Sequence, residues 1–309
     1  MTNQFDNRVF VINKKSGPTS FDIVDVFRRK TRVRKVGHTG TLDPLAEGVL
    51  LLCTGKATRA VEHFMNLSKW YEFEIRLGTG TTTLDAEGEV TDDVPCPDLG
   101  EDEIRDAAES FVGECVLAPP AYSAIKRNGK RLYELARAGQ NPAVESRRVV
   151  VHVFDVTKID LPGVFCRLKC SRGTYVRSLA KEFGAKLGLP AHIRGLVRTA
   201  IGNFRIENGY SSDLVSAGEL SGLEGITLAD ALSFLPGFVV SRNAKRGLMN
   251  GVLPDYGDVL QTIGAPAEDD AVRLLDDAGE LLAIGTRGKG RLKCVDSYRL
   301  FADNGRPQG

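Results

Sequence analysis

The sequence has little that would support metal, disulfide or membrane chemistry. Among its 309 residues are six cysteines and four histidines, with no C-x-x-C pair and no clustering of the two types. We therefore expect no metal site, and thiols that are reduced and mostly buried. No apolar run reaches the roughly 18 residues that a membrane-spanning helix needs. The N-terminal residues lack the pattern of a secretory signal, so a cytoplasmic protein is expected.

Sequence motifs for nucleotide binding and for hydrolysis are also missing. G-K-A-T at 55–58 is not a Walker A motif, because Leu50 and Ala57 stand where that motif requires glycine and serine or threonine. G-H-T-G-T at 37–41 does not fit G-x-G-x-x-G, and neither G-x-S-x-G nor H-E-x-x-H occurs. A P-loop enzyme and the common serine and zinc hydrolases are therefore not indicated.

The charge of the chain is balanced overall but unevenly distributed. The net charge is only +1, yet six of the eight residues in R-R-K-T-R-V-R-K at 28–35 are basic. Residues 85–109 carry eleven acids against one arginine. Basic segments in a nearly neutral chain are typical of a protein that holds a polyanion on one face. Solvated charged helices would give the same pattern, so charge alone leaves both interpretations open.

Hydrophobic periodicity predicts an α+β fold. In residues 70–78 apolar side chains alternate with charged ones, which is typical of a half-buried strand with Tyr71 on its buried face. Thr19 or Ser20 is expected to cap one helix, and Thr174 another that places Tyr175 and Arg177 in its first turn. The acidic stretch 85–109 is expected to be a loop leading into a surface helix. The other predicted strands are 9–13, 49–54, 148–156, 164–170 and 193–204.

One carboxylate, Asp43, has an unusual sequence context. It lies in V-G-H-T-G-T-L-D-P-L-A-E-G at 36–48, between a glycine-rich segment and Pro44. A residue before proline is restricted to extended geometry, so Asp43 and Pro44 are expected to form a defined turn. An Asp-Pro pair usually does no more than cap its own backbone. The neighbouring motifs argue for more than that here.

Six stretches of the chain, taken in order, resemble the pseudouridine synthases that act on position 55 of tRNA. Chance agreement of six ordered motifs over residues 9–204 is negligible. The departures at Lys15, Arg59 and Val197 concern details of RNA contact. The stretches are K-K-S-G-P-T-S-F-D (14–22), the segment around G-T-L-D-P (37–59), K-W-Y-E-F-E-I-R-L-G (69–78), P-P-A-Y-S-A-I-K-R-N-G-K-R-L-Y-E-L-A-R-A-G (119–139), S-R-G-T-Y-V-R-S-L (171–179) and G-L-V-R-T-A-I-G-N-F (195–204).

The resemblance implies a particular domain organisation. Residues 1–234 are expected to form a catalytic domain with a mixed, mainly antiparallel sheet flanked by helices, carrying an RNA-gripping insertion at about 119–148. Residues 235–309 are expected to form a small β-rich, PUA-like RNA-binding domain, and D-D-A-G-E within them indicates a hairpin. The implied protein is a monomer that binds the T-arm of tRNA and needs neither cofactor nor metal.

The resemblance also implies roles for individual residues. Asp43 would be the catalytic residue, attacking ribose C1′ or base C6 of a flipped uridine or removing the 2′ proton. Arg177 would pair with Asp43. Tyr71 would stack on the uracil and handle the C5 proton, and Tyr175 and Leu196 would line the pocket. The expected RNA contacts are His38, Lys14, Arg28, Arg29, Arg32, Arg34, Lys35, Lys126, Arg127, Lys130 and Arg131.

Three other functions compete with this interpretation. A non-catalytic tRNA chaperone of the same fold would bind RNA without Asp43 chemistry. A guide-RNA-dependent relative that modifies ribosomal RNA is disfavoured by the 119–148 insertion and by the lack of long basic tails. A hydrolase using Asp43 would need a second acid or a metal site, and no motif supplies one.

Overall fold

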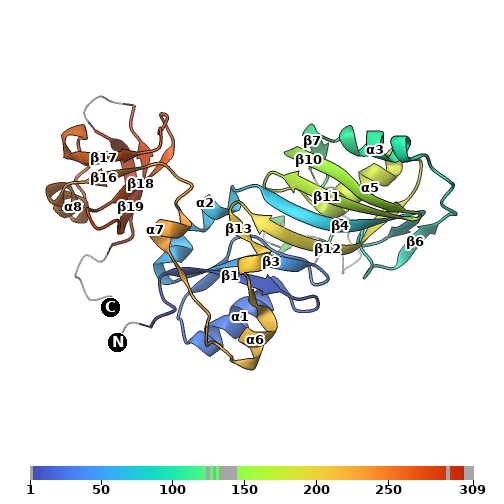
Figure 1. The fold of residues 1–309 in the computed structure, drawn as a ribbon, viewed down its shortest axis with the longest axis horizontal. Helices are drawn as coiled ribbons and strands as arrows, with labels where there is room; N and C mark the ends of the chain where they lie inside the picture. Colours follow the sequence, from blue (N-terminus) through green and yellow to red (C-terminus); the bar gives the residue numbers. More distant parts are fainter. Residues whose placement is uncertain (1–2, 123–125, 128–129, 132–144, 290–292, 303–309) are drawn as a thin grey trace.

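A computed structural model places the chain in two larger sheets and two short two-stranded sheets, with helices around them (Figure 1). It describes residues 3–122, 126–127, 130–131, 145–289 and 293–302, with only the backbone described at 126, 127, 130 and 131. The strands of the longer sheet are β1 (Arg8–Lys14), β2 (Val36–His38), β3 (Glu47–Thr54), β4 (Lys69–Leu77), β7 (Gly113–Leu117), β10 (Arg147–Asp160), β11 (Gly163–Cys170), β12 (Ala191–Ile201), β13 (Phe204–Arg205), β14 (Tyr210–Ser211) and β15 (Ile226–Thr227).

The longer sheet is mixed and mainly antiparallel, as predicted. Its strand order is β14-β1-β3-β12-β4-β11-β10-β7, with β2, β13 and β15 paired at its margins. Only the β1–β14 and β3–β12 pairs within it run parallel. In β4 the predicted alternation is confirmed, because Tyr71, Phe73, Ile75 and Leu77 are all buried. Each of these side chains therefore faces the core and not solvent.

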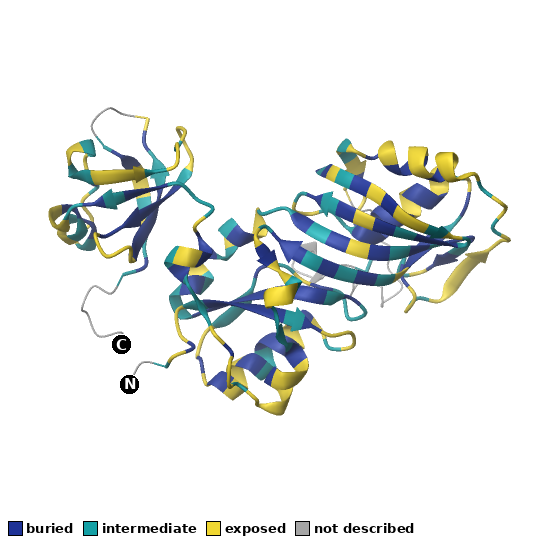
Figure 2. Ribbon diagram, in the orientation of Figure 1, coloured by how far each residue is buried: buried dark blue, intermediate teal, exposed yellow. Residues whose placement is uncertain are grey.

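Strand β3 is buried on both of its faces, which explains its continuous apolar sequence V-L-L-L-C. Leu50 and Leu52 belong to a core that contains the helices on one side of the sheet. Val49, Leu51 and Cys53 belong to a second core on the opposite side. Figure 2 shows this buried centre, with exposed residues on the outer helices and at alternating positions along the outer strands. Full burial of each leucine stabilises the fold by about 1.5–3 kcal/mol.

Helices cover the sheet on both sides. Helix α1 begins after Thr19, whose side chain forms a capping box with Asp22. Thr19 is one of the two caps predicted for this helix, so that prediction is confirmed. Helix α5 has Tyr175 at its N-cap, and the Thr174 hydroxyl donates instead to the Ser171 carbonyl at 3.1 Å, so the predicted Thr174 cap is wrong. The helices and 3-10 turns of this part are α1 (Ser20–Thr31), η1 (Gly55–Ala60), α2 (Val61–Met65), α3 (Glu101–Glu109), α5 (Val176–Lys186), η2 (Ile206–Asn208), α6 (Ser212–Ala217) and α7 (Leu228–Ala231).

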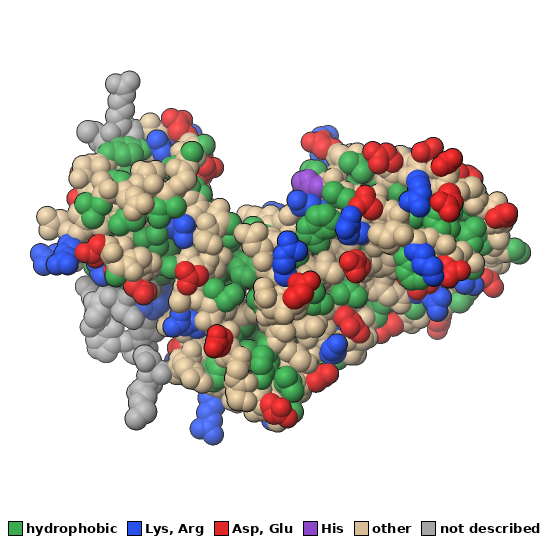
Figure 3. Space-filling view, viewed as in Figure 1, with side chains coloured by type: hydrophobic (Ala, Val, Ile, Leu, Met, Phe, Trp, Pro, Cys, Tyr) green, Lys and Arg blue, Asp and Glu red, His purple; other side chains and the backbone are tan. Residues whose placement is uncertain are grey.

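The acidic stretch contains more regular structure than its composition predicts. Strands β5 (Thr79–Thr81) and β6 (Val90–Asp93) form a small hairpin. The sequence did not predict this hairpin, because β6 is fully exposed and shows no alternation of apolar and polar residues. The predicted surface helix is present as α3. Figure 3 shows acidic side chains gathered over the end of the longer sheet that carries this helix. Helix α3 and strand β6 of the acidic stretch thus lie at the end of the molecule that is far from the second sheet (Figure 1).

The second sheet follows residue 236 and has the order β17-β16-β18-β19-β20. The predicted hairpin is confirmed: Asp276 donates its backbone N–H to the Glu280 carbonyl, and the turn joins β18 to β19. Leu275 and Phe301 pack into the second core of the longer sheet, so the two sheets share apolar contacts. The elements are β16 (Gly237–Val240), α8 (Arg242–Met249), η3 (Tyr256–Asp258), β17 (Val259–Ile263), β18 (Ala271–Leu275), β19 (Leu281–Arg287) and β20 (Val295–Leu300).

The cysteines and the helices agree with the expectations from composition. All six cysteines are free thiols, and Cys53, Cys166, Cys170 and Cys294 are buried. Burial raises the pKa of the Cys170 thiol to about 11, so this group stays protonated. Among the helices that the structure describes, none is long and apolar enough to cross a membrane.

Candidate active site

Asp43 lies in the loop between β2 and β3, at the start of a tight turn. Its carbonyl accepts the backbone N–H of Ala46 at 3.0 Å, which confirms the turn expected from Asp-Pro. Gly48 begins the buried part of β3 with a φ of +101°. A Cβ atom there would lie 2.2 Å from the Arg198 carbonyl oxygen, so only glycine lets β3 pair with β12 at this point.

Lys14 holds one end of the Asp43 turn. Its Nζ donates to the carbonyls of Ala46 at 2.6 Å and Pro44 at 3.0 Å, and to that of Lys15 at 3.1 Å. The side chain is completely buried, so the predicted RNA contact by Lys14 is wrong. Burial lowers the pKa of Lys14 to about 8, and the nearby Asp43 charge opposes that shift. Lys14 acts on the loop backbone, not on a ligand.

Arg198 holds the other end of the loop. Its Nε donates to the Val49 carbonyl at 2.7 Å, and its Nη2 donates to the Gly40 carbonyl at 3.0 Å. The side chain is buried, and it lines the same pocket as Asp43. Sequence reasoning missed it, although Arg198 follows Leu196 by two residues on one strand and therefore faces the same side. Two buried cations thus fix the loop by binding its carbonyl groups.

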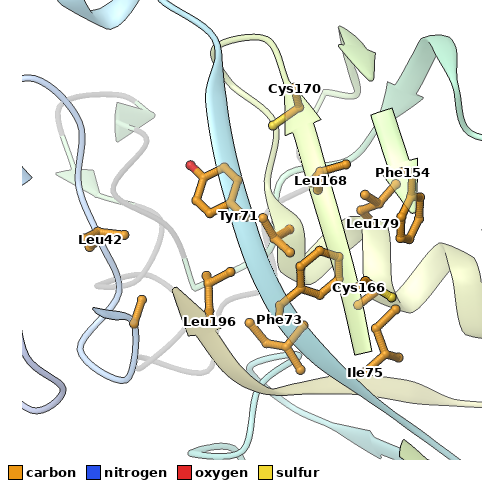
Figure 4. Packing of buried hydrophobic residues seen from close by; sticks show 14 of the residues in the cluster. Leu42, Tyr71, Phe73, Ile75, Phe154, Cys166, Leu168, Cys170, Leu179 and Leu196 are labelled. Atoms are coloured by element: carbon orange, nitrogen blue, oxygen red, sulfur yellow. The ribbon is translucent and has the colours of Figure 1, made fainter. Parts of the chain in front are cut away.

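A pocket of about 300 Å³ opens beside this loop. Asp43, Tyr71, Tyr175, Arg177 and Leu196, the five residues that the sequence analysis assigned to the catalytic pocket, all line it. Figure 4 shows Tyr71 on β4 and Leu196 on β12 next to each other, with Leu42 of the Asp43 loop facing them. Four further cations line the pocket, namely Lys69, Arg147, Arg172 and Arg198. The pocket is therefore strongly electropositive around a single carboxylate.

Arg177 joins two carboxylates across the pocket wall. Its Nη2 donates to Asp43 Oδ1 at 3.0 Å, and its Nε lies 2.9 Å from Oδ2 without the alignment of a hydrogen bond. Its Nη1 lies 3.4 Å from Asp85 Oδ2. The same guanidinium donates to the carbonyls of Thr83 and Tyr122, both at 2.9 Å. With 4% of its side chain exposed, Arg177 has a fixed position from which it orients Asp43.

Asp85 is a site residue that the sequence analysis missed. Its carboxylate accepts the Thr83 hydroxyl and the backbone N–H of Glu87. The side chain is buried, unlike most of the acidic stretch 85–109 in which it occurs. Nothing in that stretch distinguishes Asp85 by composition. No motif marks it either, because strand β5 and a turn separate Asp85 from β4, the strand that carries Tyr71.

Burial dominates the ionisation of the two central groups. It raises the pKa of Asp43, while the Arg177 charge lowers that pKa and the Asp85 charge adds to the rise. The Asp43 side chain keeps 30% of its surface open to the pocket. Burial also raises the pKa of Tyr71, so the phenol is neutral at physiological pH. A carboxylate and a neutral aromatic group therefore face the same cavity.

The residues predicted to bind RNA do not gather at this pocket. His38 is half-buried on β2, and its Nδ1 accepts the Gly40 N–H at 3.3 Å. Burial and the nearby Arg198 lower the pKa of His38, which makes the ring neutral. The basic residues Arg28, Arg29, Arg32, Arg34 and Lys35 are exposed on or just after α1, and none lines the pocket. The side chains of Lys126, Arg127, Lys130 and Arg131 lie outside what the structure describes.

Metal ligands are not grouped in the part of the chain that the structure describes. Within residues 3–122 and 145–302, apart from the undescribed 290–292, no three His, Cys, Asp or Glu side chains are arranged to hold an ion. The pocket contributes one carboxylate, two tyrosines and several cations. This set suits a polyanionic ligand whose reacting part is a small planar group.

Comparison with known proteins identifies the class of protein to which this chain belongs. Residues 28–176 match the family described as "TruB family pseudouridylate synthase (N terminal domain)". A relative from Clostridium tetani named "tRNA pseudouridine synthase B" is 39% identical over 290 residues, which cover 94% of this chain and 98% of the relative. One from Burkholderia pseudomallei with the same name is 45% identical over 211 residues, 68% of this chain and 69% of the relative. The chain belongs to the TruB family of pseudouridine synthases.

Solved structures agree with this assignment at the level of the fold. The protein superposes on a chain of the "Cbf5-Nop10-Gar1 Complex" with a TM-score of 0.77 and 25% identity, covering 97% of this chain and 87% of that one. A chain of an "H/ACA RNP bound to a substrate RNA containing 2'-deoxyuridine" gives a TM-score of 0.76 at 24% identity, with coverage of 98% and 87%. The expected α+β architecture is thus confirmed.

Proposed function

We propose that this protein isomerises uridine to pseudouridine at position 55 in the T-arm loop of tRNA. The observation that carries the proposal is the Asp43–Arg177 pair at the centre of a cationic pocket, in a chain that belongs to the TruB family. Both relatives named above are called tRNA pseudouridine synthases, and the one from Clostridium tetani matches 94% of this chain, which supports tRNA as the substrate. The activity is that of an isomerase, since substrate and product contain the same atoms.

The reaction requires the uracil to leave the base stack and enter the pocket. Unstacking costs a few kcal/mol, and contacts between the surrounding cations and RNA phosphates offset that cost. Tyr71 and Leu196 then hold the base between an aromatic and an aliphatic side chain, with Tyr175 at the helix start completing the wall. In this arrangement the base is oriented before any bond changes, which lowers the entropic part of the barrier.

Asp43 is the catalytic group in this proposal. The N1–C1′ bond breaks, the C5–C1′ bond forms, C5 loses a proton and N1 gains one, so no external group is consumed. The carboxylate has three possible routes: attack on C1′, attack on C6, or removal of the 2′ proton. Each route places the Asp43 oxygen beside the ribose–base junction. Arg177 keeps the carboxylate ionised and aimed at that junction. Tyr71, as a neutral phenol in the same pocket, handles the C5 proton in this proposal.

The rest of the chain supports binding in this proposal. Residues 1–234 form the catalytic domain, and the insertion at 119–148 grips the RNA. Residues 235–309, which include the second sheet, form a PUA-like RNA-binding domain. The protein works as a monomer in the cytoplasm and needs no cofactor, because every atom and charge of the reaction comes from the substrate and the pocket.

The test uses an unmodified tRNA transcript with the wild-type protein, with Asp43→Asn and with the matched control Asp25→Asn. Pseudouridine is mapped by its carbodiimide adduct and the resulting reverse-transcription stops, and binding is measured by filter retention. We expect one stop at position 55 for the wild type and the control, and none for Asp43→Asn despite normal binding. Tight binding without any stop for the wild type would contradict the proposal and favour a tRNA chaperone.

A further inference from the structure

A second cavity adjoins the active-site pocket and is lined mainly by arginine. This groove, which we call the arginine groove, has a volume of about 690 Å³. It shares Met65, Arg147, Arg172 and Gly173 with the pocket, so the two cavities are continuous. Figure 3 shows the molecule hollowed between its two sheets, and the groove takes lining residues from both sides. Its lining residues are Thr58, Arg59, Val61, Glu62, Met65, Arg147, Arg148, Val149, Arg172, Gly173 and Arg299.

The charge of the arginine groove is high and is not neutralised by neighbouring acids. Five arginines line it against one acid, Glu62. All five arginines are exposed. Within the described part of the chain, no carboxylate lies at ion-pair distance from any of them. Exposed arginines without acidic partners at the rim of a pocket are typical of a surface that meets a polyanion.

Three of these arginines are held by neutral acceptors. Arg59 Nη1 donates to the Leu300 carbonyl at 3.1 Å, and Arg299 Nη1 donates to the Arg59 carbonyl at 3.1 Å. Arg172 Nη1 donates to the side-chain oxygen of Asn66. Each contact uses one of the five N–H groups of a guanidinium, so the charge and most donors stay available to a ligand. The side chains are oriented in advance without loss of charge, which reduces the entropic cost of binding.

We propose that the arginine groove holds the sugar-phosphate backbone of the T-arm strand next to the modified uridine and leads it to Arg299 on the second sheet. The proposal rests on the proposed function, because it places the reacting uridine in the adjoining pocket. Arginine matches phosphate oxygens with two parallel donors, and every groove cation is arginine. Met65, 42% exposed at the junction of the two cavities, offers an apolar contact where the strand leaves the pocket.

The test removes two charges that lie in the groove but not in the pocket. The variant Arg148→Gln/Arg299→Gln is compared with Arg167→Gln/Arg194→Gln, which removes two exposed charges outside both cavities. Filter binding at several salt concentrations gives the affinity for tRNA and for an isolated T-arm hairpin. Single-turnover assays at saturating enzyme give the rate of the chemical step. Thermal melting checks that each variant is folded.

We expect the groove variant to bind both RNAs about tenfold more weakly, with a salt slope smaller by about 1.5, as the loss of two phosphate contacts predicts. Its saturating rate equals that of the wild type, and the Arg167→Gln/Arg194→Gln control keeps wild-type affinity. Unchanged affinity and slope in the groove variant would overturn the proposal. A loss seen with whole tRNA but not with the hairpin would overturn the assignment to the T-arm strand.

The same experiment separates this proposal from the proposed function. If the wild type is active and the groove variant binds RNA normally, only the proposed role of the arginine groove is refuted. A wild type that makes no pseudouridine while the groove variant loses affinity refutes the function, and the groove remains an RNA-binding surface.

Discussion

Two sets of basic residues in this protein have opposite surroundings. The run at 28–35 is dense in sequence and exposed, and its Arg28 and Arg29 lie 2.6 and 3.3 Å from the one carboxylate of Asp25. Lys14 and Arg198 lie in mainly apolar strands, are buried, and donate to backbone carbonyls around Asp43. Exposed ion pairs contribute about 0–1 kcal/mol, whereas a buried polar network has a high cost when it is broken. The position of a cation, not its local density, therefore indicates its importance for the site.

The largest effect is expected from Arg177→Lys. An ammonium group cannot reach Asp43 and the carbonyls of Thr83 and Tyr122 together, so the carboxylate loses its fixed orientation. We expect the single-turnover rate to fall about 10²–10³-fold, the usual cost of removing one preorganised donor. Arg28→Lys on α1 is the matched control and should keep the wild-type rate. A near-normal rate for Arg177→Lys would show that charge alone is sufficient.

Lys14→Met should give the next largest effect, on stability. The change leaves the buried carbonyl of Ala46 without its donor, and it leaves the Pro44 carbonyl with only the Gly17 N–H. We expect the free energy of unfolding to fall by about 2–4 kcal/mol in urea titrations. Lys15→Met, at the exposed neighbouring position, should change it by less than about 0.5 kcal/mol. Equal effects of the two substitutions would contradict the buried role of Lys14.

Asp85→Asn should shift the pH dependence of catalysis. Because the pKa of Asp43 is raised, its carboxylate becomes protonated at a higher pH than an ordinary aspartate does. The rate should therefore fall on the acid side at a pH above about 3.9, the ordinary pKa of aspartate. The Asp85 charge contributes to that rise, so its removal should move the limb to lower pH. Single-turnover rates between pH 4.5 and 8 measure the shift, with Asp92→Asn on exposed β6 as the control. A limb that moves upward in Asp85→Asn would reverse this account.

The smallest effect is expected from Arg28→Gln/Arg29→Gln. Both arginines already share Asp25, and both lie outside the pocket and the arginine groove. We expect tRNA affinity to change by less than about threefold, since paired surface charges add little. Filter binding at low salt is the most sensitive measurement. A tenfold loss of tRNA affinity would show that α1 belongs to the RNA-binding surface, so that α1 and the arginine groove would not differ in this respect.

Much of the fold and of the pocket was predictable from sequence, for identifiable reasons. Strand alternation placed Tyr71 on the buried face, and the strand-to-helix junction brought Tyr175 and Arg177 to the same pocket. The role of Asp85 was not predicted, because the sequence of an acidic stretch does not distinguish one buried acid from its exposed neighbours. Lys14 was assigned to RNA because burial of a lysine cannot be recognised from a K-K pair. These errors concern long-range partners, which periodicity does not encode.

The two-sided burial of β3 has a consequence for the heat tolerance of catalysis. The Asp43 loop runs directly into this strand, and β3 carries side chains of both cores. Lys14 of β1 and Arg198 of β12 also bind the loop carbonyls, and both strands pair with β3, so we expect the loop to lose its order together with the two cores. Inactivation on heating should coincide with loss of the whole fold, and the β3 amides should be among the last to exchange with solvent.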